Sequence, residues 1–556
     1  MKLKLFLLFA VACCLAATEV RSQTYAITNA RIVTVSGPTI EKGTVVLRNG
    51  LIDAVGPNLM PPADAVVIDG TGFTVYPGFI DALTNLGIQA QQQQQRPGGV
   101  GGGPQAQQQQ QQTAQTVSNS NYPAGLRPEE LVLDDLRPGE SQFEAARNAG
   151  FTTVLTVGRT GIFNGKSAVI NLAGDSVSAM TIRSPFAEHF SFATIGGGQY
   201  PGSLLGTFSA LRQMLLDAQR LQKLQKAYTA NPRGMKRPDP DRSLEALFPI
   251  LDRQMSLVFN ANSENEINRA LDLAKEFNIR AIIAGGTESW KLADRLKAQD
   301  VAVLLSLNFP KRTAAASTDA DPEPLDVLRM RAEAPKGAAR LAQAGVKFAF
   351  QSGGAATLTD FFTNAGKAVE NGLSRDAAIR AMTLGSAEVL GVDDRLGSIE
   401  KGKIANVVLV RGEVFARDRF VSRIFVDGKL FEQKEPPARR EGSTRGGGTT
   451  AAPVPAVASV GGNYSVIIDI PGQSTSGTLA LVQQGAVLTG TLTTQIGVVQ
   501  IKDGKVTAEG FTFSGSIEFG GTQMEIVVRG SVTGNQISGT IDSPQGAVPF
   551  SGTRNP

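Results

Sequence analysis

Histidine and cysteine are nearly absent from this chain of 556 residues. His189 is the one histidine, and the two cysteines, Cys13 and Cys14, lie close to the amino terminus. Imidazole and thiolate are common zinc ligands, and imidazole is the usual general base near neutral pH. A catalytic zinc site would therefore have to be built almost wholly from carboxylates, which suit magnesium or calcium better.

The chain also has little excess of positive over negative charge. The formal net charge is +4, with 19% of the residues charged and 42% hydrophobic. These proportions are ordinary for a soluble globular protein, and the lysines and arginines are mostly dispersed along the chain. We therefore expect neither a nucleic-acid partner nor binding to an anionic membrane, and the length allows two to four domains.

The amino-terminal segment, residues 1–22, has the pattern of a secretory signal peptide. Lys2 and Lys4 precede an apolar run over residues 5–17. That run is too short to span a bilayer, and no leucine stands three residues before either cysteine, as a lipoprotein signal would favour. We expect an exported protein, periplasmic or extracellular, whose mature chain has no membrane span and no cysteine.

The central region, residues 76–395, alternates short apolar runs with helical patterns. Five runs read as buried strands: Thr152 to Val157, Met255 to Ala261, Arg280 to Gly285, Val301 to Leu307 and Lys347 to Ser352. Helical periodicity follows most of them, and Ser263 with Glu266 forms a capping-box pattern. Strands alternating with helices predict an α/β fold with a (β/α)8 TIM-like barrel.

The flanks of this region have a different pattern. Residues 24–75 and 396–432 form matching sets of short runs in which apolar and polar residues alternate, as in half-buried strands. Asn49-Gly50 and Asp427-Gly428 are dipeptides that favour tight turns.

Two stretches lack the apolar residues needed to form a core. Residues 88–123 are rich in glutamine and glycine, and we expect a disordered insert that is a tolerated expansion of a surface loop; the alternative is a lid or a partner-binding segment. Residues 433–460 read as a linker.

The last region, residues 461–556, contains about eight short alternating strands with frequent glycine. It predicts a separate all-β antiparallel barrel or sandwich, in which the aromatic residues fill the core.

Two motifs resemble a known family. "YPGFID" at residues 76–81 and "LGSIEKGKIANVVLVRG" at residues 396–412 are similar to an imidazolonepropionase-like member of the amidohydrolase superfamily, and the resemblance extends over residues 25–431. It implies a metal-dependent barrel enclosed by a small composite β-sandwich domain made from residues 24–75 and 396–432. It also implies hydrolysis of C–N bonds other than peptide bonds, with zinc or another divalent metal. Asn406 stands where that family usually has aspartate.

The metal-binding positions that the resemblance implies are occupied here by residues of another chemistry. They carry Leu83, Asn85, Asn260, Gly286, Ser352 and Gly353 in place of histidines, a threonine and an aspartate. Leucine and glycine side chains offer no ligand, and a neutral amide is a poor ligand for zinc. We therefore expect no metal and no other cofactor. Asn85, Asn260 and Ser352 could instead line a neutral, hydrogen-bonding pocket.

Two further residues are candidates for catalysis. Asp81 is a carboxylate that we expect at the mouth of the pocket, although a single acid without a partner more often has a structural role. His189 lies among phenylalanines in "SPFAEHFSF", a setting typical of a packed, hydrogen-bonded histidine. The chain has no Gly-x-Ser-x-Gly motif of a serine hydrolase.

Three functions remain open from the sequence. The first is a metal-free pseudoenzyme that binds a small molecule or serves as the partner subunit of an active homologue. The alternative is an active hydrolase for amide, dipeptide or ester substrates, with a metal-independent site or one completed by a partner. The third places the function in residues 461–556, as an adhesion or ligand-binding module.

Overall fold

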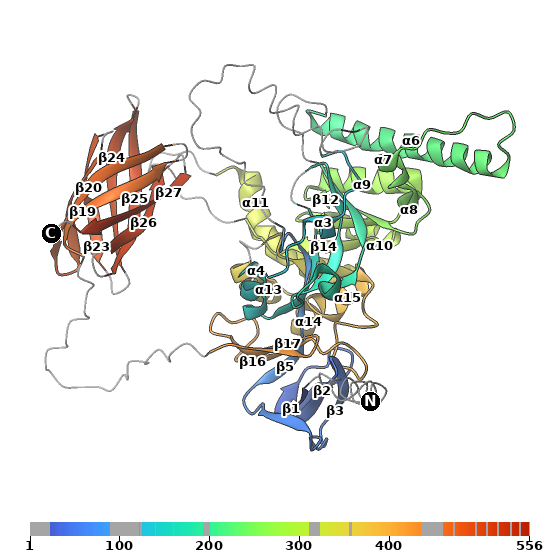
Figure 1. Ribbon diagram of the computed structural model, residues 1–556, viewed down its shortest axis with the longest axis horizontal. Helices are drawn as coiled ribbons and strands as arrows, with labels where there is room; N and C mark the ends of the chain where they lie inside the picture. The colour runs from blue at the N-terminus through green and yellow to red at the C-terminus, as the bar shows by residue number, and fades with distance from the viewer. Residues whose placement is uncertain are drawn as a thin grey trace, which may run out of the picture. The chain divides into compact units, whose positions relative to one another are not determined.

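The computed structural model describes fifteen stretches of the chain, which leave out the predicted signal peptide, most of the Gln/Gly-rich insert and nearly all of the predicted linker. They are residues 23–88, 122, 125–139, 141–158, 161–192, 201–310, 323–354, 358–434, 460–470, 473–494, 497–506, 510–519, 522–533, 536–543 and 546–554. The chain divides into two compact units, Met1–Ala438 and Arg439–Pro556 (Figure 1).

An eight-stranded sheet joins the two flanks of the first unit. Its order is β18-β17-β16-β5-β1-β2-β3, with β4 also paired to β1. The strands are β1 (Thr24–Ile32), β2 (Ile40–Arg48), β3 (Leu51–Gly56), β4 (Ala65–Asp69), β5 (Thr74–Pro77), β16 (Val407–Arg411), β17 (Phe420–Val426) and β18 (Lys429–Glu432). The antiparallel pairing of β5 with β16 joins the early strands to the late ones, which confirms the composite β domain.

The predicted turn dipeptides lie against each other in this domain. Asn49 and Gly50 have φ values of 52° and 77°, and Asp427 and Gly428 have φ values of 51° and 72°. Positive φ at both central residues suits tight hairpins, for which Asn-Gly and Asp-Gly are favoured. The Ala405 N–H donates to the Gly50 carbonyl oxygen, and the Gly428 N–H donates to the Ala405 carbonyl oxygen.

The barrel strands follow in the centre of the chain. They are β6 (Phe79–Thr84), β7 (Phe151–Thr156), β8 (Phe163–Lys166), β9 (Ala168–Asn171), β11 (Ala187–Ser191), β12 (Ser256–Ala261), β13 (Ala281–Gly285), β14 (Ala302–Ser306) and β15 (Phe348–Gln351). The five strands expected from apolar runs are β7, β12, β13, β14 and β15. After β15 the chain returns to β6, where the Gly353 N–H donates to the Leu83 carbonyl oxygen at 3.1 Å.

One part of the barrel differs from a regular (β/α)8 arrangement. β8 and β9 form a nearly continuous segment between β7 and β11, and this segment runs antiparallel to both neighbours. Only residues 157–162 separate β7 from β8. A crossover to a parallel strand needs about a dozen residues or more, so this short connection can only return antiparallel. β10 (Thr181–Arg183) then extends the sheet beyond β9.

Helices cover the outside of the barrel (Figure 1). Those of the first half are α3 (Val132–Asp135), α4 (Ser141–Asn148), α5 (Val177–Met180), α6 (Leu204–Ala230), α7 (Arg242–Glu245), α8 (Phe248–Leu251) and α9 (Glu264–Phe277). Those of the second half are α10 (Ala293–Ala298), α11 (Leu325–Glu333), α12 (Gly337–Ala344), α13 (Leu358–Glu370), α14 (Arg375–Ala381) and α15 (Leu384–Leu390), with the 3-10 turns η1 (Ser289–Leu292) and η2 (Ala334–Lys336). The Ser263–Glu266 capping box is present at α9. Among the described helices, none is both long and apolar enough to cross a membrane.

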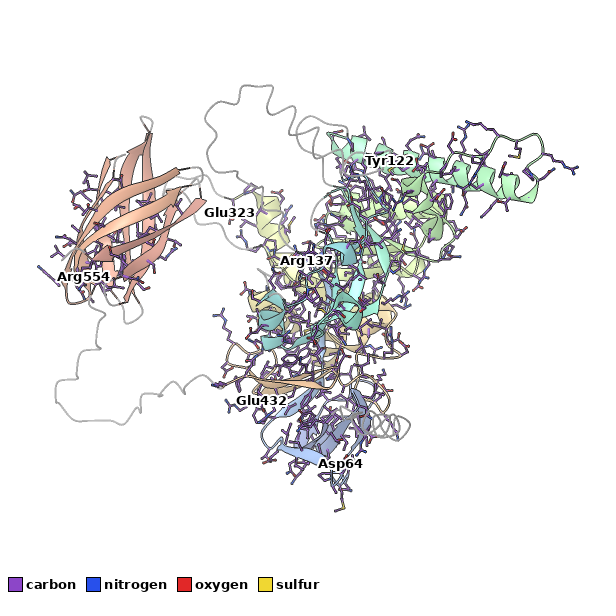
Figure 2. The ribbon with its side chains drawn as sticks, viewed as in Figure 1. Asp64, Tyr122, Arg137, Glu323, Glu432 and Arg554 are labelled. Atoms are coloured by element: carbon purple, nitrogen blue, oxygen red, sulfur yellow. The ribbon has the colours of Figure 1, made fainter. Side chains whose placement is uncertain are left out.

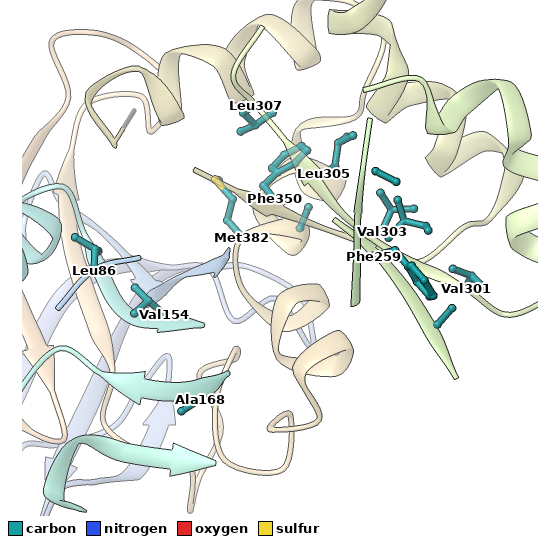
Figure 3. Close-up of a cluster of buried hydrophobic side chains, with 14 of the residues drawn as sticks. Leu86, Val154, Ala168, Phe259, Val301, Val303, Leu305, Leu307, Phe350 and Met382 are labelled. Carbon is teal, nitrogen blue, oxygen red and sulfur yellow. The ribbon is translucent and has the colours of Figure 1, made fainter. Parts of the chain in front are cut away.

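Burial in the barrel core explains why the barrel strands could be predicted from the sequence. Phe259, Val303 and Phe350 are fully buried and come from three different strands (Figure 3). Parallel barrel strands are covered on both faces, by the barrel interior and by the helices, so their residues form nearly continuous apolar runs. The same burial holds the strand ends in fixed positions around the mouth of the barrel.

The second unit is a closed antiparallel barrel. Its strands are β19 (Gly462–Ile470), β20 (Gln473–Gln484), β21 (Val487–Thr494), β22 (Gly497–Gln500), β23 (Lys502–Val506), β24 (Phe511–Phe519), β25 (Thr522–Thr533), β26 (Gln536–Ser543) and β27 (Gly546–Arg554). Pairing of β20 with β21 closes a ring of eight strands, and β22 pairs with β21 outside that ring.

Aromatic side chains fill the interior of this second barrel. Tyr464, Phe511, Phe513 and Phe550 are buried, as expected from the sequence. Arg554 lies near the carboxyl terminus (Figure 2). It donates to the Tyr464 hydroxyl oxygen at 2.7 Å and to the Gly461 carbonyl oxygen at 2.9 Å. These bonds tie the last strand to the first.

Candidate functional site

A cavity of about 610 Å³ opens at the carboxyl ends of the barrel strands. This end of a (β/α)8 barrel is where active sites of the fold lie. The structure brings six of the predicted positions together around the cavity: Leu83, Asn85, His189, Asn260, Ser352 and Gly353. Two others, Asp81 and Gly286, do not line it.

Asp81 is fully buried beneath the cavity, not exposed at its mouth as expected. Its Oδ1 accepts hydrogen bonds from the backbone N–H groups of Leu83 at 3.3 Å and Ser352 at 2.9 Å. Its Oδ2 accepts a third bond from the Ser352 hydroxyl at 2.5 Å. Burial raises the pKa of the Asp81 carboxyl to about 7, although the bonds from Ser352 and Leu83 act in the opposite direction.

His189 is a neutral, packed side chain on β11. Its Nε2 lies 2.8 Å from the Ser167 hydroxyl oxygen, and only 4% of the residue is exposed. Burial lowers the pKa of His189 to about 3, because charging the imidazole would require desolvating a cation. The ring therefore contributes a neutral surface to the cavity, as its position among phenylalanines suggested.

Gly286 does not line the cavity, whereas its neighbour Gly285 does. Gly285 has a φ of 86°, and a side-chain carbon there would lie 2.4 Å from Asn262 Oδ1. Gly286 has a φ of 59° and faces Val303 instead. The two left-handed residues let the chain turn sharply after β13 and leave room for the Asn262 amide.

Sequence reasoning missed several polar residues of the cavity. They are Thr84, Asn164, Asn262, Ser306, Asn308 and Gln351. Most of them stand at or just after the carboxyl end of a strand, so small polar residues following a predicted strand were the available signal. Asn164 lies on the antiparallel segment, where no barrel strand is recognisable from the sequence.

Two buried polar atoms in the cavity wall have no hydrogen-bond partner among the described residues. They are Thr84 Oγ1 and Gln351 Oε1, and the two residues are 1% and 4% exposed. The Gln351 amide nitrogen is fixed by donation to the Leu304 carbonyl oxygen at 3.3 Å, so the Oε1 acceptor is held in place. Burying an unpaired polar atom costs free energy, which a bound molecule with a suitable donor would recover.

The described residues that line the cavity carry no formal charge near neutral pH. Among the described residues that line it there is no Asp, Glu, Lys or Arg, and His189 is neutral. Amides, hydroxyls and backbone groups supply nearly all of its polar atoms. This surface is suited to hydrogen bonding with an uncharged molecule.

The residues at the mouth do not fit the divalent metal that the resemblance implied. A catalytic zinc ion needs about three nitrogen, sulfur or carboxylate ligands. Leu83 and Gly353 have no donor atom in their side chains, and Asn260 offers only a neutral amide. Within the described parts of the chain, no group of three or more His, Cys, Asp or Glu residues could hold a metal ion.

Comparison with known proteins relates this fold to one family. Residues 315–431 match the amidohydrolase family. An amidohydrolase from Thermotoga maritima MSB8 superimposes with a TM-score of 0.60 and 24% identity, over 74% of this chain and all of the other. A prolidase complexed with N-methylphosphonate-L-proline covers the same shares of the two chains, with 18% identity and a TM-score of 0.45. No curated protein matches.

The family match spans the last barrel strand and the return into the composite sheet, while the Thermotoga maritima structure extends the similarity in fold over most of the first unit. The pairing of β20 with β21 shows independently that the second unit is a closed barrel. The chain therefore carries a segment, residues 315–431, that matches the amidohydrolase family within a unit that shares its fold with the Thermotoga maritima amidohydrolase, followed by a closed eight-stranded antiparallel β-barrel.

Proposed function

We propose that this protein binds a small, uncharged polar molecule at the mouth of its amidohydrolase-like barrel and does not carry out the metal-dependent hydrolysis of its family. One observation carries the proposal: the cavity at the usual catalytic position is lined by amides and hydroxyls, without ionised side chains or a metal-ligand set among its described residues. The volume of about 610 Å³ lies within the range of small-molecule sites.

Electrostatics favour an uncharged ligand over an ion. A charged molecule entering this cavity would lose its hydration and meet no counter-ion among the described lining residues, which is unfavourable. A neutral molecule with several N–H or O–H groups could donate to Gln351 Oε1 and pair with the Thr84 hydroxyl. Sugars, lactams and cyclic ureides belong to this chemical class.

A calorimetric screen tests the proposal. Neutral sugars, lactams and hydantoins would be titrated into the purified protein beside carboxylated or aminated analogues of similar size. We expect binding only among the neutral compounds. Tight binding restricted to charged compounds would contradict the proposal.

A pair of variants assigns the binding to the cavity. Asn260→Ala removes an amide from the cavity wall, whereas Asn463→Ala removes an exposed amide from β19 in the second unit. Loss of one hydrogen bond should weaken binding by about fivefold in the first variant, as expected for roughly 1 kcal/mol, and leave it unchanged in the second. Equal affinities in the two variants would place the binding elsewhere.

The cellular setting belongs to the same proposal. Residues 1–22 have the composition of a signal peptide, and on that basis we propose an exported protein, either periplasmic or extracellular. There it would act alone as a binding protein or beside an active homologue. Fractionation of cells expressing the full chain, with the same chain lacking residues 2–22 as a control, tests the export.

A second function is favoured by the contact between Asp81 and Ser352. The Ser352 hydroxyl borders the cavity and donates to a buried carboxylate, the arrangement of a nucleophile beside a general base. In a metal-independent hydrolase, this hydroxyl would attack an ester or amide carbonyl and pass its proton to Asp81, which would give it to the alcohol or amine that leaves as the C–O or C–N bond breaks. Water would then hydrolyse the acylated Ser352. Turnover of such substrates that is lost in Ser352→Ala and retained in Ser178→Ala, an exposed serine variant, would favour this function over binding alone.

A further inference from the structure

A second cavity lies at the opposite end of the barrel. It has a volume of about 550 Å³ and is bordered by the amino-terminal ends of β12, β13 and β14, at Ser256, Ala281 and Ala302. Its wall also includes the ends of α9 and α15 and Gly391, which follows α15. Unlike the cavity at the carboxyl ends of the strands, this basal cavity is rich in charge.

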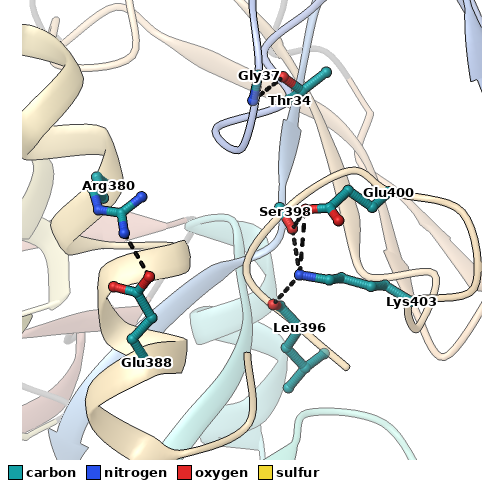
Figure 4. Close-up of polar contacts among 8 residues, drawn as sticks. All are labelled: Thr34, Gly37, Arg380, Glu388, Leu396, Ser398, Glu400 and Lys403. Atoms are coloured by element: carbon teal, nitrogen blue, oxygen red, sulfur yellow. Dashed lines mark hydrogen bonds and ion pairs between the residues drawn. The ribbon is translucent and has the colours of Figure 1, made fainter. Parts of the chain in front are cut away.

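Cations outnumber anions in the basal cavity. Its five cationic residues are Arg183, Arg253, Lys275, Arg280 and Lys347, and its two acidic residues are Asp300 and Glu388. Both acids are already paired: the Asp300 carboxylate lies 3.1 Å from Lys347 Nζ, and the Glu388 carboxylate lies 2.5 Å from Arg380, which is outside the lining (Figure 4).

Four cations therefore face the basal cavity without a compensating charge. Arg183, Arg253, Lys275 and Arg280 form no ion pair with another described residue. They come from four separate places in the chain: β10, the loop before β12, the last turn of α9 and the residue before β13. Like charges gathered around one concavity raise its positive potential, because the low-dielectric walls focus the field.

Two of the guanidinium groups are fixed in position. Arg183 Nη1 donates to the carbonyl oxygens of Leu390 and Gly391, each at 2.9 Å. Arg253 Nη1 donates to the Asn278 backbone oxygen at 3.0 Å and to Asn278 Oδ1 at 2.8 Å. The remaining N–H groups of each planar fork can still donate, and a pre-positioned guanidinium loses less entropy when it binds an oxyanion.

We infer that the basal cavity binds a small molecule carrying at least two negatively charged oxyanion groups, such as a phosphorylated or polycarboxylate compound. The excess of unpaired cations, their convergence on one concavity and the fixed guanidinium groups together support this ligand class. The site is independent of the neutral cavity at the other end of the barrel, so the proposed function can fail while this inference stands.

Calorimetry on the full chain with inorganic pyrophosphate as the probe tests the inference. A double variant, Lys275→Gln with Arg280→Gln, removes two cations whose side chains are exposed and form no ion pair with a described residue. Its control is Arg220→Gln with Lys223→Gln, which removes the same charge from the exposed face of α6, away from the cavity.

We expect the wild-type chain to bind one pyrophosphate, with an affinity that falls as sodium chloride is raised. The cavity variant should bind at least about tenfold more weakly, as expected for the loss of two charge-assisted contacts, while the control should bind like the wild type. Equal weakening in both variants, or no saturable binding by the wild type, would overturn the inference. Thermal unfolding of both variants shows whether a loss of binding reflects a loss of fold.

Discussion

Asp81 on β6 accepts two hydrogen bonds from Ser352, a residue that follows β15 and lies 271 positions later in the chain. The backbone N–H of Ser352 reaches Asp81 Oδ1, and its hydroxyl reaches Asp81 Oδ2. These contacts join the first and last strands of the barrel where the ring closes, directly beneath the cavity. Asp81, the last residue of the "YPGFID" motif, thus makes a contact that holds the barrel together.

The buried carboxyl of Asp81 should make stability depend on pH. Burial raises its pKa to about 7 in the folded chain, against an ordinary value of 3.8. The folded state thus keeps a proton that the unfolded state has lost, so this contribution to stability is fully present below about pH 4 and is lost as the pH rises through 7. We expect the wild type to lose up to roughly 4 kcal/mol of unfolding free energy relative to Asp81→Asn between pH 4 and pH 8.

Urea denaturation followed by the fluorescence of Trp290, the one tryptophan of the chain, measures this difference within the first unit. Asp326→Asn, at an exposed position on α11, is the matched control and should follow the wild type at every pH. If the Asp81→Asn and wild-type curves stayed parallel from pH 4 to pH 8, the Asp81 carboxyl would not be the titrating group.

His189 should produce the opposite dependence on pH. Burial lowers the pKa of its imidazole to about 3, so the unfolded chain gains a proton below about pH 6.5 that the folded chain does not accept. Its contribution is present above that pH and is lost as the pH falls towards 3. At pH 4, we expect the wild type to have lost roughly 3 kcal/mol relative to His189→Gln, compared with their difference at pH 7.5. The same fluorescence titration checks this, and a constant difference would contradict it.

Asn406 shows why an aspartate is not required at this position. Its Nδ2 donates to Thr153 Oγ1 at 3.0 Å and to Asn171 Oδ1 at 2.9 Å, and its Oδ1 accepts from the Asp427 N–H at 2.8 Å. Asn406→Asp would bury a charge and lose both donors. We expect it to lower the unfolding free energy by about 2–4 kcal/mol, measured by urea denaturation at pH 7.5.

The matched control for that prediction is Asn58→Asp, at an exposed position, which should change stability by less than about 0.5 kcal/mol. If Asn406→Asp were as stable as this control, the buried amide network would accept a carboxylate, and the prediction would be wrong.

Gly285 should tolerate a side chain less well than another left-handed glycine. Gly285 and Gly402 have φ values of 86° and 89°, but a side-chain carbon at Gly285 would meet Asn262 Oδ1 at 2.4 Å, whereas Gly402 has no atom within 4 Å of that position. Gly402→Ala should cost about 1–2 kcal/mol from backbone strain alone. Gly285→Ala should cost about 1–3 kcal/mol more, because Asn262 must move. Equal melting temperatures in the two variants would contradict the close approach.

The frame of the barrel was predictable because its physical signals are local. Strands such as β12 and β14 are buried on both faces, and their apolar runs are visible without knowledge of the fold. The antiparallel segment made of β8 and β9 was missed because "FNGKSAVIN" is interrupted by polar residues and glycine. The antiparallel direction of this segment follows from the short connection between β7 and β8, and the apolar periodicity of the sequence does not indicate strand direction.

The site was predictable only in part. Leu83 and Asn260 were found because a motif or a strand end marked their positions. The prediction that Asp81 lies at the mouth of the pocket was wrong, because the burial of a side chain depends on which residues pack over it. Ser352, which is far away in the sequence, covers the Asp81 carboxyl. Gln351 was missed because an inward-facing glutamine within a strand has no sequence pattern that separates it from an outward-facing one.

The metal content of the purified protein tests most directly whether this amidohydrolase-like barrel binds a catalytic metal ion. The purified protein would be incubated with zinc, manganese or iron, passed through a desalting column and analysed by mass spectrometry of the elements. We expect only traces of metal, far below one ion per chain, because Leu83, Asn85 and Asn260 occupy positions where the family resemblance implies metal ligands. Retention of one or more zinc, manganese or iron ions per chain would show that the barrel still holds a metal and that the proposed function is wrong.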